Sequence, residues 1–179
     1  MATTGLRRAE LCGLRWSDVD LERGWLRIAQ TVTEVRGQLV VQNDWKTDAA
    51  ERSLALDART VEALRRWRTR QAQERLAWPG EWPGTDLVFT RENGEGYRPK
   101  RLSSKFTQAV DRAGLPRVGV HGVRHTAATL ALRAGVSPEV VSKRLGHASV
   151  VVTLSIYAHV FEQDDQAAAE LTAAAVYGP

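Results

Sequence analysis

Six side chains of this 179-residue sequence could together hold a phosphate group and attack it. Five are basic and one is a tyrosine: Arg7, Lys46, His121, Arg124, His147 and Tyr157. His121 and Arg124 are three positions apart, so on a helix they project from the same face. His147 directly follows a glycine that ends a predicted helix, and Tyr157 lies ten residues beyond it. This set predicts an anion-binding site with one potential nucleophile.

These residue types suit phosphoryl transfer that needs no metal ion. An arginine guanidinium can hold two oxygens of a phosphodiester and stabilise the charge of its transition state. A lysine can protonate a departing alkoxide, and a tyrosine oxygen can form a covalent phosphoester. Free tyrosine has a pKa of about 10, so only about one phenol in a thousand is ionised at neutral pH. Histidine and arginine neighbours would therefore have to activate Tyr157.

Each of these residues also has an interpretation that involves no chemistry. Arg7 at a helix start and Lys46 in a hairpin would commonly be solvated charges. The HxxR pair could form surface ion pairs, and Tyr157 could be a core residue with its hydroxyl at the rim. His121 and His125 have the i, i+4 spacing of zinc ligands, but no glutamate lies between them and no carboxylate accompanies them. We therefore expect neither a metal ion nor another cofactor.

The composition is that of a globular domain. Hydrophobic residues make up 43% and charged residues 26% of the chain, which excludes a disordered tail protein. No run of about 18 apolar residues is present, so no membrane span is expected. A single cysteine, Cys12, excludes a disulfide framework. The net charge of +4 is modest, but most of the basic residues are arginines, which suit phosphate recognition.

The first third of the chain must position Arg7 and Lys46. Apolar residues spaced by three and four predict a helix over residues 9–16, directly after Arg7. Alternating hydrophobicity predicts three short strands in an antiparallel meander, at residues 25–33, 39–41 and 52–56. Lys46 lies in the polar turn between the second and third of these strands.

Helices are predicted for most of the remaining chain. They cover residues 58–77, a segment from Ser103 or Ser104 to Ala113, and residues 121–134, 138–145, 149–157 and 163–176. Asp57 and Ser137 are expected N-caps, and Gly146 is an expected helix end. The predicted fold class is therefore mixed and mainly α, with a small three-stranded antiparallel sheet. The length fits one domain over residues 1–179.

Four segments, taken in order, resemble the sequence boxes of one enzyme family. They are TGLRRAELCGLRWSDVD around Arg7, WKTDAAERSLAL around Lys46, HGVRHT around Arg124, and LGHASVVVTLSIYAH around Tyr157. From Thr4 to about Tyr157 the chain resembles the catalytic domain of the tyrosine recombinases, also called the phage integrase family. The N-terminal core-binding domain usual in that family has no counterpart here. Residues 1–179 are therefore interpreted as a catalytic domain truncated at its N-terminal edge.

The resemblance implies an enzyme that cuts and rejoins DNA. Tyr157 would attack the scissile phosphate and form a 3′-phosphotyrosyl link, which frees a 5′-hydroxyl. Glu10 and Arg52 match an acidic and a basic position of the family. The other implied roles are a phosphate clamp by Arg7 and Arg124, an acid for the leaving oxygen in Lys46, an acid or base in His121, and a hydrogen bond to the phosphate from His147.

The same resemblance implies the partners and the setting. Double-stranded DNA is the expected partner, with a homotetramer on DNA and a monomer without it. No ATP or metal is expected to take part, because the covalent link keeps the energy of the broken bond. No membrane is expected as a partner. The protein is expected to be cytoplasmic, nucleoid-associated and of bacterial or phage origin. Its last helix, over residues 163–176, is expected to dock on a neighbouring protomer.

Two other functions remain open from the residues alone. A type IB topoisomerase would use similar chemistry, although the LGH box and its spacing to Tyr157 favour a recombinase. A non-catalytic DNA-binding module is the other alternative, because residues 135–157 also read as a helix-turn-helix. Residues 150–152, however, are three valines, too apolar for an exposed recognition helix. Such a module would also not need Arg7, Lys46 and Tyr157 together.

Overall fold

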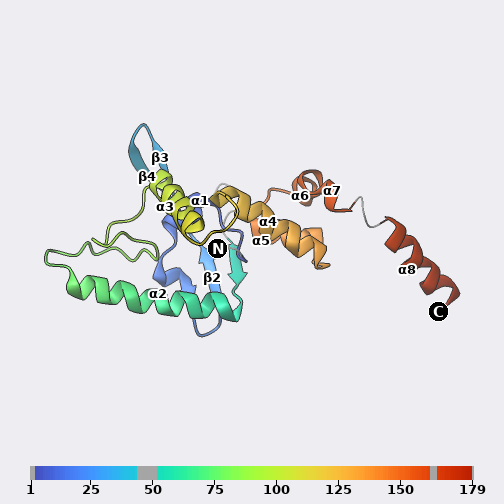
Figure 1. The fold of residues 1–179 in the computed structure, drawn as a ribbon, viewed down its shortest axis with the longest axis horizontal. Helices are drawn as coiled ribbons and strands as arrows, with labels where there is room; N and C mark the ends of the chain where they lie inside the picture. The colour runs from blue at the N-terminus through green and yellow to red at the C-terminus, as the bar shows by residue number, and fades with distance from the viewer. Residues whose placement is uncertain (1–2, 44–51, 162–164, 179) are drawn as a thin grey trace.

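The structure is a computed structural model that describes residues 3–43, 52–161 and 165–178. Its elements, in chain order, are α1 (Arg8–Gly13), the 3-10 turn η1 (Trp16–Asp18), β1 (Val19–Asp20), β2 (Trp25–Ile28), β3 (Thr31–Val35), β4 (Gln38–Gln42), β5 (Arg52–Ala55), α2 (Ala58–Ala77), α3 (Pro99–Arg112), α4 (Val120–Arg133), α5 (Pro138–Leu145), α6 (Val150–Ile156), α7 (Ala158–Phe161) and α8 (Asp165–Tyr177). In Figure 1, α2 runs along the lower edge, the β3–β4 hairpin projects from the upper edge, and α4 to α7 extend to the right. The mainly helical fold class agrees with the prediction.

The strands form two antiparallel sheets. One has three strands in the order β1–β2–β5, with Leu26 opposite Leu54, and the other pairs β3 with β4. A small three-stranded antiparallel sheet is therefore present, but its strands differ from those of the predicted meander. The predicted second strand, residues 39–41, lies in β4 and pairs with β3 in the other sheet, and β1 takes its place in the three-stranded sheet. The segment predicted as one strand, residues 25–33, divides into β2 and β3, and each half joins a different sheet.

The division between β2 and β3 follows from the close approach of α1. The Gln30 side-chain amide donates to the Gly13 carbonyl oxygen at 2.8 Å. A Cβ atom at Gly13 would lie only 2.8 Å from the Gln30 carbonyl oxygen, so the two backbones can approach only because this residue is glycine. Strand periodicity carries no signal for a contact between segments this far apart in sequence.

The helices α2 and α3 begin at clear N-terminal signals. α2 follows Asp57, whose carboxylate accepts the Thr60 backbone N–H at 3.0 Å, which confirms the predicted cap. α3 begins at Pro99, with proline in the first helical position, so the predicted start at Ser103 or Ser104 is wrong. These two serines lie inside the helix and donate to carbonyl oxygens one turn earlier, at 3.3 and 3.2 Å.

The C-terminal half contains the three short helices that the sequence predicts, with ends shifted by at most one residue. Ser137 caps α5, because its hydroxyl accepts the Val140 backbone N–H at 3.4 Å. Gly146 ends α5 in the left-handed conformation, with φ at 66°. Tyr157 lies between α6 and α7, and α7 was not predicted.

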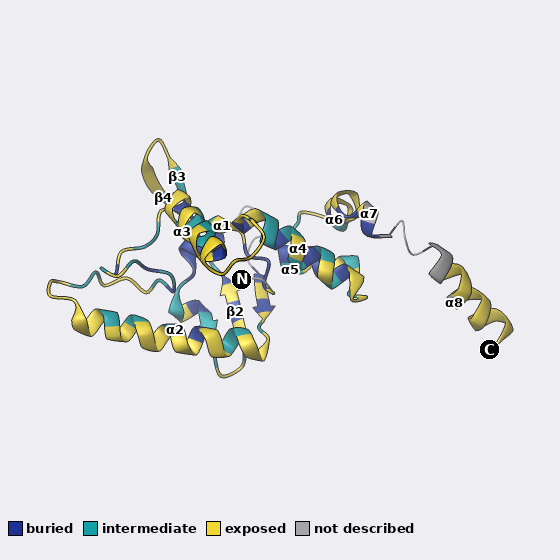
Figure 2. Ribbon diagram, in the orientation of Figure 1, coloured by how far each residue is buried: buried dark blue, intermediate teal, exposed yellow. Residues whose placement is uncertain are grey.

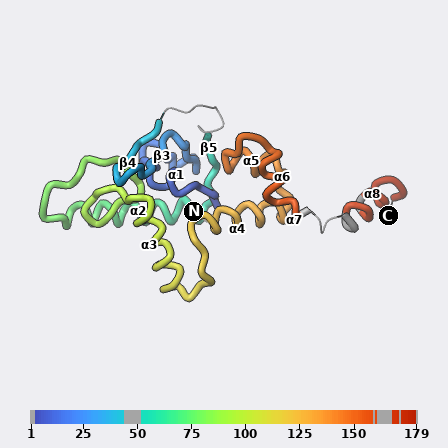
Figure 3. Tube along the Cα trace, turned by 90° about the horizontal axis from the view of Figure 1, so that it is seen from above, coloured from blue at the N-terminus to red at the C-terminus, as the bar shows by residue number. Residues whose placement is uncertain are grey.

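The last helix, α8, lies apart from the rest of the molecule in both views (Figures 1 and 3). Its described side chains are exposed, as their colour in Figure 2 shows. The predicted helix starts at residue 163, outside the described residues, and α8 itself starts at Asp165. Within the described ranges, no helix combines the length and apolar character needed to cross a bilayer.

Two hydrophobic clusters form the core. The first packs the three-stranded sheet against α1 and α2 and includes Leu11, Ile28 and Leu64. The second packs α4 against α5 and includes Leu132 and Leu145. Between them, the N-terminal segment before α1 meets the end of α5 through polar contacts. The candidate site is built from these contacts.

Candidate active site

Arg7, the residue before α1, is fixed from two sides. Its backbone N–H donates to Glu10 Oε2 at 2.7 Å, and its guanidinium donates to Glu10 Oε1 at 2.9 Å. The other terminal nitrogen donates to the carbonyl oxygen of Gly146 at 2.6 Å, across 139 residues of sequence. The side chain nevertheless stays 42% exposed. Arg7 is therefore held in place and still accessible to a ligand, which disfavours its interpretation as an ordinary solvated charge.

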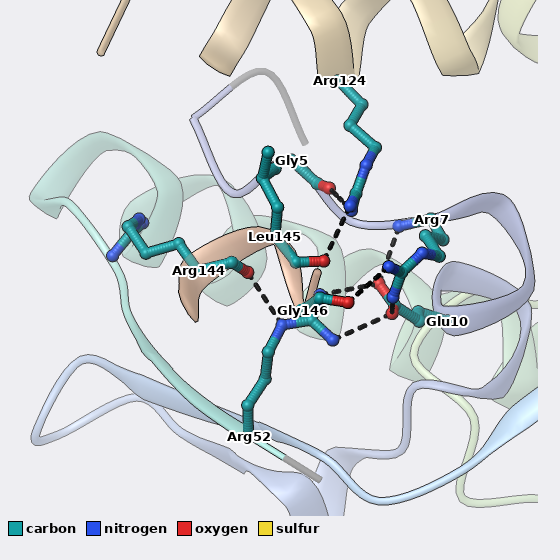
Figure 4. A network of polar contacts seen from close by, with 8 residues as sticks. All are labelled: Gly5, Arg7, Glu10, Arg52, Arg124, Arg144, Leu145 and Gly146. Carbon is teal, nitrogen blue, oxygen red and sulfur yellow. Dashed lines mark hydrogen bonds and ion pairs between the residues drawn. The ribbon is translucent and has the colours of Figure 1, made fainter. Parts of the chain in front are cut away.

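A buried ion pair supports Arg7 from below (Figure 4). Arg52 on β5 donates to both carboxylate oxygens of Glu10, at 2.9 and 3.0 Å, and the two side chains are 4% and 2% exposed. Burial by itself raises the pKa of Glu10, but the hydrogen bonds and charges of Arg52 and Arg7 outweigh it and lower that pKa below its usual value. Glu10 is therefore a carboxylate at neutral pH, and it positions both arginines.

Arg124 on α4 is buried, with 5% of its surface exposed. It donates to the carbonyl oxygens of Gly5 and Leu145 at 2.6 and 2.7 Å. Burial, and after it the charge of Arg7, lowers the pKa of Arg124 to about 10, so the group stays cationic at neutral pH. Because Arg124 is buried and binds backbone carbonyls, the HxxR pair is not a set of surface ion pairs.

The end of α5 holds three guanidinium groups on three successive carbonyl oxygens. Arg52 Nε donates to the Arg144 carbonyl at 2.7 Å, while Arg124 and Arg7 bind the next two. Figure 4 shows the three side chains converging on this turn from β5, α4 and the start of α1. The last carbonyls of a helix lack partners within it and carry partial negative charge, which suits cations.

His147 directly follows this turn and is attached to α6. Its Nδ1 atom lies 2.8 Å from the hydroxyl of Thr153, a fully buried residue. Burial, followed by the charge of Arg124, lowers the pKa of His147 to about 4. His147 is therefore a neutral imidazole at neutral pH, with Nδ1 engaged by the protein.

Tyr157 packs into the second hydrophobic cluster and is 2% exposed. Its hydroxyl lies 3.0 Å from His125 Nδ1, and His125 Nε2 lies 2.9 Å from His121 Nε2. Burial raises the pKa of Tyr157, and the charge of Arg124 opposes that rise. Tyr157 is thus a core residue whose hydroxyl faces polar groups. Its position is compatible both with a structural role and with a role as the nucleophile.

The structure brings together five of the six residues singled out in the sequence. Arg7, Arg124 and His147 gather around the end of α5, and His121 is linked to Tyr157 through His125. The sixth, Lys46, lies outside the described residues. The contact between His125 and Tyr157 was missed, although the i, i+4 spacing of the two histidines had drawn attention to His125. Within the described ranges, His, Cys, Asp and Glu side chains form no group of three or more suited to a metal ion.

Comparison with known sequences points to one family. A family model described as the phage integrase family matches residues 1–164. The chain is 32% identical to the tyrosine recombinase XerC-like protein of Caldanaerobacter subterraneus, over 93% of this chain and 46% of that protein. It is 25% identical to the integrase of Staphylococcus phage L54a, over 92% of this chain and 47% of that integrase. The chain thus spans about half the length of the curated relatives it matches.

Solved structures share the fold. The Tn1549 transposon integrase, solved in complex with transposon right-end DNA, matches with a TM-score of 0.77 and 25% identity, over 94% of this chain and 55% of that one. The XerA recombinase matches with a TM-score of 0.68 and 27% identity, over 99% of this chain and 55% of that one. These similarities cover nearly all of the chain, including both hydrophobic clusters.

Proposed function

Because this chain belongs to the phage integrase family of tyrosine recombinases, we propose that residues 1–179 act as the catalytic domain of a site-specific DNA recombinase. One observation supports this most directly. Arg7 and Arg124, 117 positions apart in sequence, are fixed on adjacent carbonyls at the end of α5, and the charge of Arg124 also acts on buried Tyr157. Two oriented cations and a nucleophile are suited to phosphodiester cleavage without a metal, because the cations can stabilise the transition-state charge and the nucleophile is already positioned.

The two arginines would form the phosphate clamp. Each guanidinium carries five N–H donors, and the contacts with Gly146, Gly5 and Leu145 use only some of them. Donors that remain would bind the non-bridging oxygens and stabilise the added negative charge of the pentacoordinate transition state. If Nδ1 of the neutral His147 ring accepts from the Thr153 hydroxyl, its proton is on Nε2, and that N–H would donate to the same phosphate.

Tyr157 would be the nucleophile. Its oxygen forms a bond to phosphorus, the bond from phosphorus to the 5′-oxygen breaks, and a 3′-phosphotyrosyl ester remains. The departing 5′-oxygen takes a proton from Lys46. The phenol proton ends on His121, the histidine that is linked to Tyr157 through His125. Rejoining reverses these steps, so the ester conserves the bond energy and no ATP or metal ion is consumed.

The burial of Tyr157 adds a condition to this chemistry. With 2% of the residue exposed, its hydroxyl can meet a DNA phosphate only after a neighbouring element such as α6 moves or DNA remodels the site. α6 is short, and it exposes Val151, Val152 and Leu154. A small helix with an exposed apolar face is well suited to move when a partner covers that face.

The partners follow from the proposed chemistry. Double-stranded DNA is the substrate, with a tetramer on DNA and a monomer without it. α8, exposed and apart from the body, would dock on a neighbouring protomer. A recombinase that acts on chromosomal or phage DNA would work in the cytoplasm, at the nucleoid.

The decisive experiment captures the covalent intermediate. Because the target sequence is unknown, the chain is incubated with a library of nicked duplexes of randomised sequence, and denaturing gels separate covalent adducts for sequencing. We expect adducts that share a sequence motif. Relaxation of supercoiled plasmid without a shared motif would indicate a topoisomerase, and selective binding without adducts would indicate the helix-turn-helix module.

The matched control for that experiment is Tyr157→Phe. This variant removes the attacking oxygen and the hydrogen bond to His125, so we expect no adduct, unchanged DNA binding, and a loss of about 1 kcal/mol in the free energy of unfolding. Mass spectrometry should place the nucleotide on Tyr157 of the wild-type protein. An adduct mapped to Tyr97 or Tyr177, or one that persists in the variant, would contradict the assignment.

A further inference from the structure

The hydroxyl of Tyr157 begins a line of three hydrogen-bonding side chains. Its oxygen lies 3.0 Å from His125 Nδ1, and the opposite nitrogen of the same ring lies 2.9 Å from His121 Nε2. The two histidine rings stand nearly perpendicular, with centroids 4.5 Å apart. Their separation of four residues on α4 brings them into contact, because side chains at i and i+4 share a helix face.

Only one arrangement of protons lets a neutral phenol donate along this line. If the Tyr157 hydroxyl donates to His125 Nδ1, that nitrogen carries no proton, so the proton of the neutral His125 ring is on Nε2. His125 Nε2 then donates to His121 Nε2, and His121 carries its own proton on Nδ1. In this arrangement each donor in the line has an acceptor, and each donated proton lies on the side of its hydrogen bond nearer to Tyr157.

The surroundings keep His125 neutral. Burial lowers the pKa of His125, and a positive charge on Arg124, or on His121 when that ring is protonated, lowers it further. His147, after the end of α5, is itself a neutral ring, and Tyr157 contacts His125 through its hydroxyl. A neutral imidazole in contact with the attacking oxygen is suited to accept its proton.

We propose that His125 is a further catalytic residue, which accepts the phenol proton of Tyr157 and relays a proton to His121. The proposal rests on the recombinase function proposed above. As the bond from the Tyr157 oxygen to phosphorus forms, the phenol proton moves to His125 Nδ1 and the His125 Nε2 proton moves to His121 Nε2. The bond from phosphorus to the 5′-oxygen breaks, and that oxygen takes its proton separately, from Lys46.

The burial of the three residues gives the relay its direction. Tyr157 is buried, His125 is half-buried, and His121 is exposed. A proton left on His125 would add a further positive charge beside buried Arg124, which the low local dielectric makes unfavourable. Transfer to His121 moves the charge outward to the surface, where water stabilises it and can carry the proton away.

Two substitutions at His125 separate proton transfer from positioning. In His125→Asn, the amide oxygen can accept the Tyr157 hydrogen bond in place of Nδ1, but an amide does not take up a proton at neutral pH. In His125→Ala, both functions are lost. We expect both variants to bind DNA normally and to form the phosphotyrosyl adduct 10²–10⁴-fold more slowly in single-turnover assays. Added imidazole should partly restore His125→Ala.

Thr126→Ala provides the control. Thr126 is the next residue of α4, exposed, and its hydroxyl bonds only back to the Gly122 carbonyl among its described contacts, at 3.0 Å. Its cleavage rate should match that of the wild type. A near wild-type rate in His125→Asn would show that His125 only positions Tyr157, and would overturn the relay. The asparagine variant also keeps the test valid if the alanine variant fails to fold.

A substrate with a sulfur atom at the 5′-bridging position distinguishes the base from the acid. A thiolate leaves without a proton, so this substrate removes the need for an acid but not for a base at Tyr157. We expect His125→Ala to stay slow on it, and recovery to the wild-type rate would overturn the relay by assigning His125 to the leaving group. No adduct from the wild-type protein on either substrate would overturn the recombinase proposal itself, which is a different result from normal cleavage by the His125 variants.

Discussion

Arg7 and Arg124 have equivalent proposed roles but differ in burial, so their substitution should have separable effects. We expect Arg7→Lys and Arg124→Lys each to lower the cleavage rate by 10²–10³, about 3 kcal/mol, because one ammonium cannot reproduce a planar fork. Arg124→Lys should also cost about 1.5–3 kcal/mol in unfolding free energy, since it leaves the buried Gly5 and Leu145 carbonyls without that fork. Arg7→Lys should cost less stability, because the Arg7 side chain is 42% exposed.

Single-turnover cleavage and urea denaturation measure these two effects separately. The sequence alone suggests that both arginines act on the transition state and not on the fold. The buried carbonyl contacts of Arg124 add a structural role that its position in the HxxR box cannot reveal. Equal stability of the two lysine variants would contradict this separation.

His147 gives the folded protein a stability that depends on pH. Its pKa is lowered to about 4 in the folded protein, whereas an unfolded histidine titrates near pH 6.5. Between those two values the unfolded chain binds more protons. The contribution is therefore complete above about pH 6.5 and is lost as the pH falls toward 4.

The measurement is the urea midpoint as a function of pH, for the wild type and for His147→Asn. Carboxylates titrate in the same range, so the difference between the two proteins is the informative quantity. We expect the wild type to lose more stability between about pH 6.5 and 4.5 than the variant does. Parallel curves would show that His147 is not held neutral by its surroundings.

Residue types and spacing are enough to select the six candidate residues, but not their partners. The HxxR spacing depends only on helix geometry, and α4 forms over nearly the residues predicted. The contact between His125 and Tyr157 spans 32 positions and depends on how the segment after α6 packs against α4. The carbonyl oxygens that hold Arg7 and Arg124 have no sequence signal, since every residue has one.

At the scale of elements, helices with local signals are predicted well and strands poorly. Asp57, Ser137 and Gly146 act within a few residues of the helix ends that they define. The strands depend on partners that are distant in sequence, and the alternation over residues 25–33 continues through the point where β2 gives way to β3. Pro99 is an equally local signal that competes with Ser103 and Ser104, and the fixed φ of proline prevails.

Gly13 tests the contact that divides these strands. In Gly13→Ala, the new Cβ would lie 2.8 Å from the Gln30 carbonyl oxygen and 3.0 Å from the Thr31 Cα, both backbone atoms that cannot move aside cheaply. We expect a loss of about 1–3 kcal/mol in unfolding free energy. Gly84→Ala is the control, because no atom lies within 4 Å of its new Cβ, and its stability should change by less than about 0.5 kcal/mol. Equal stability of the two variants would refute the close approach.

At the scale of the whole molecule, α8 is the element without a partner in the described structure. If α8 docks on a neighbouring protomer, ending the chain at residue 164 should leave the melting temperature nearly unchanged and abolish higher-order complexes on DNA. Light scattering of complexes with the captured target would measure the assembly. A chain that ends at Tyr177 is the control and should assemble fully. Unchanged complexes after removal of α8 would refute the docking.

The last turn of α5 couples the proposed phosphate clamp to the integrity of the fold. Three successive carbonyls, those of Arg144, Leu145 and Gly146, fix arginines that arrive from three different parts of the chain. Unwinding this turn would release all three cations at once and separate the two hydrophobic clusters that it joins. The positions of the three guanidinium groups therefore all depend on the conformation of this one turn. Substitutions at different members of the network should consequently be strongly non-additive.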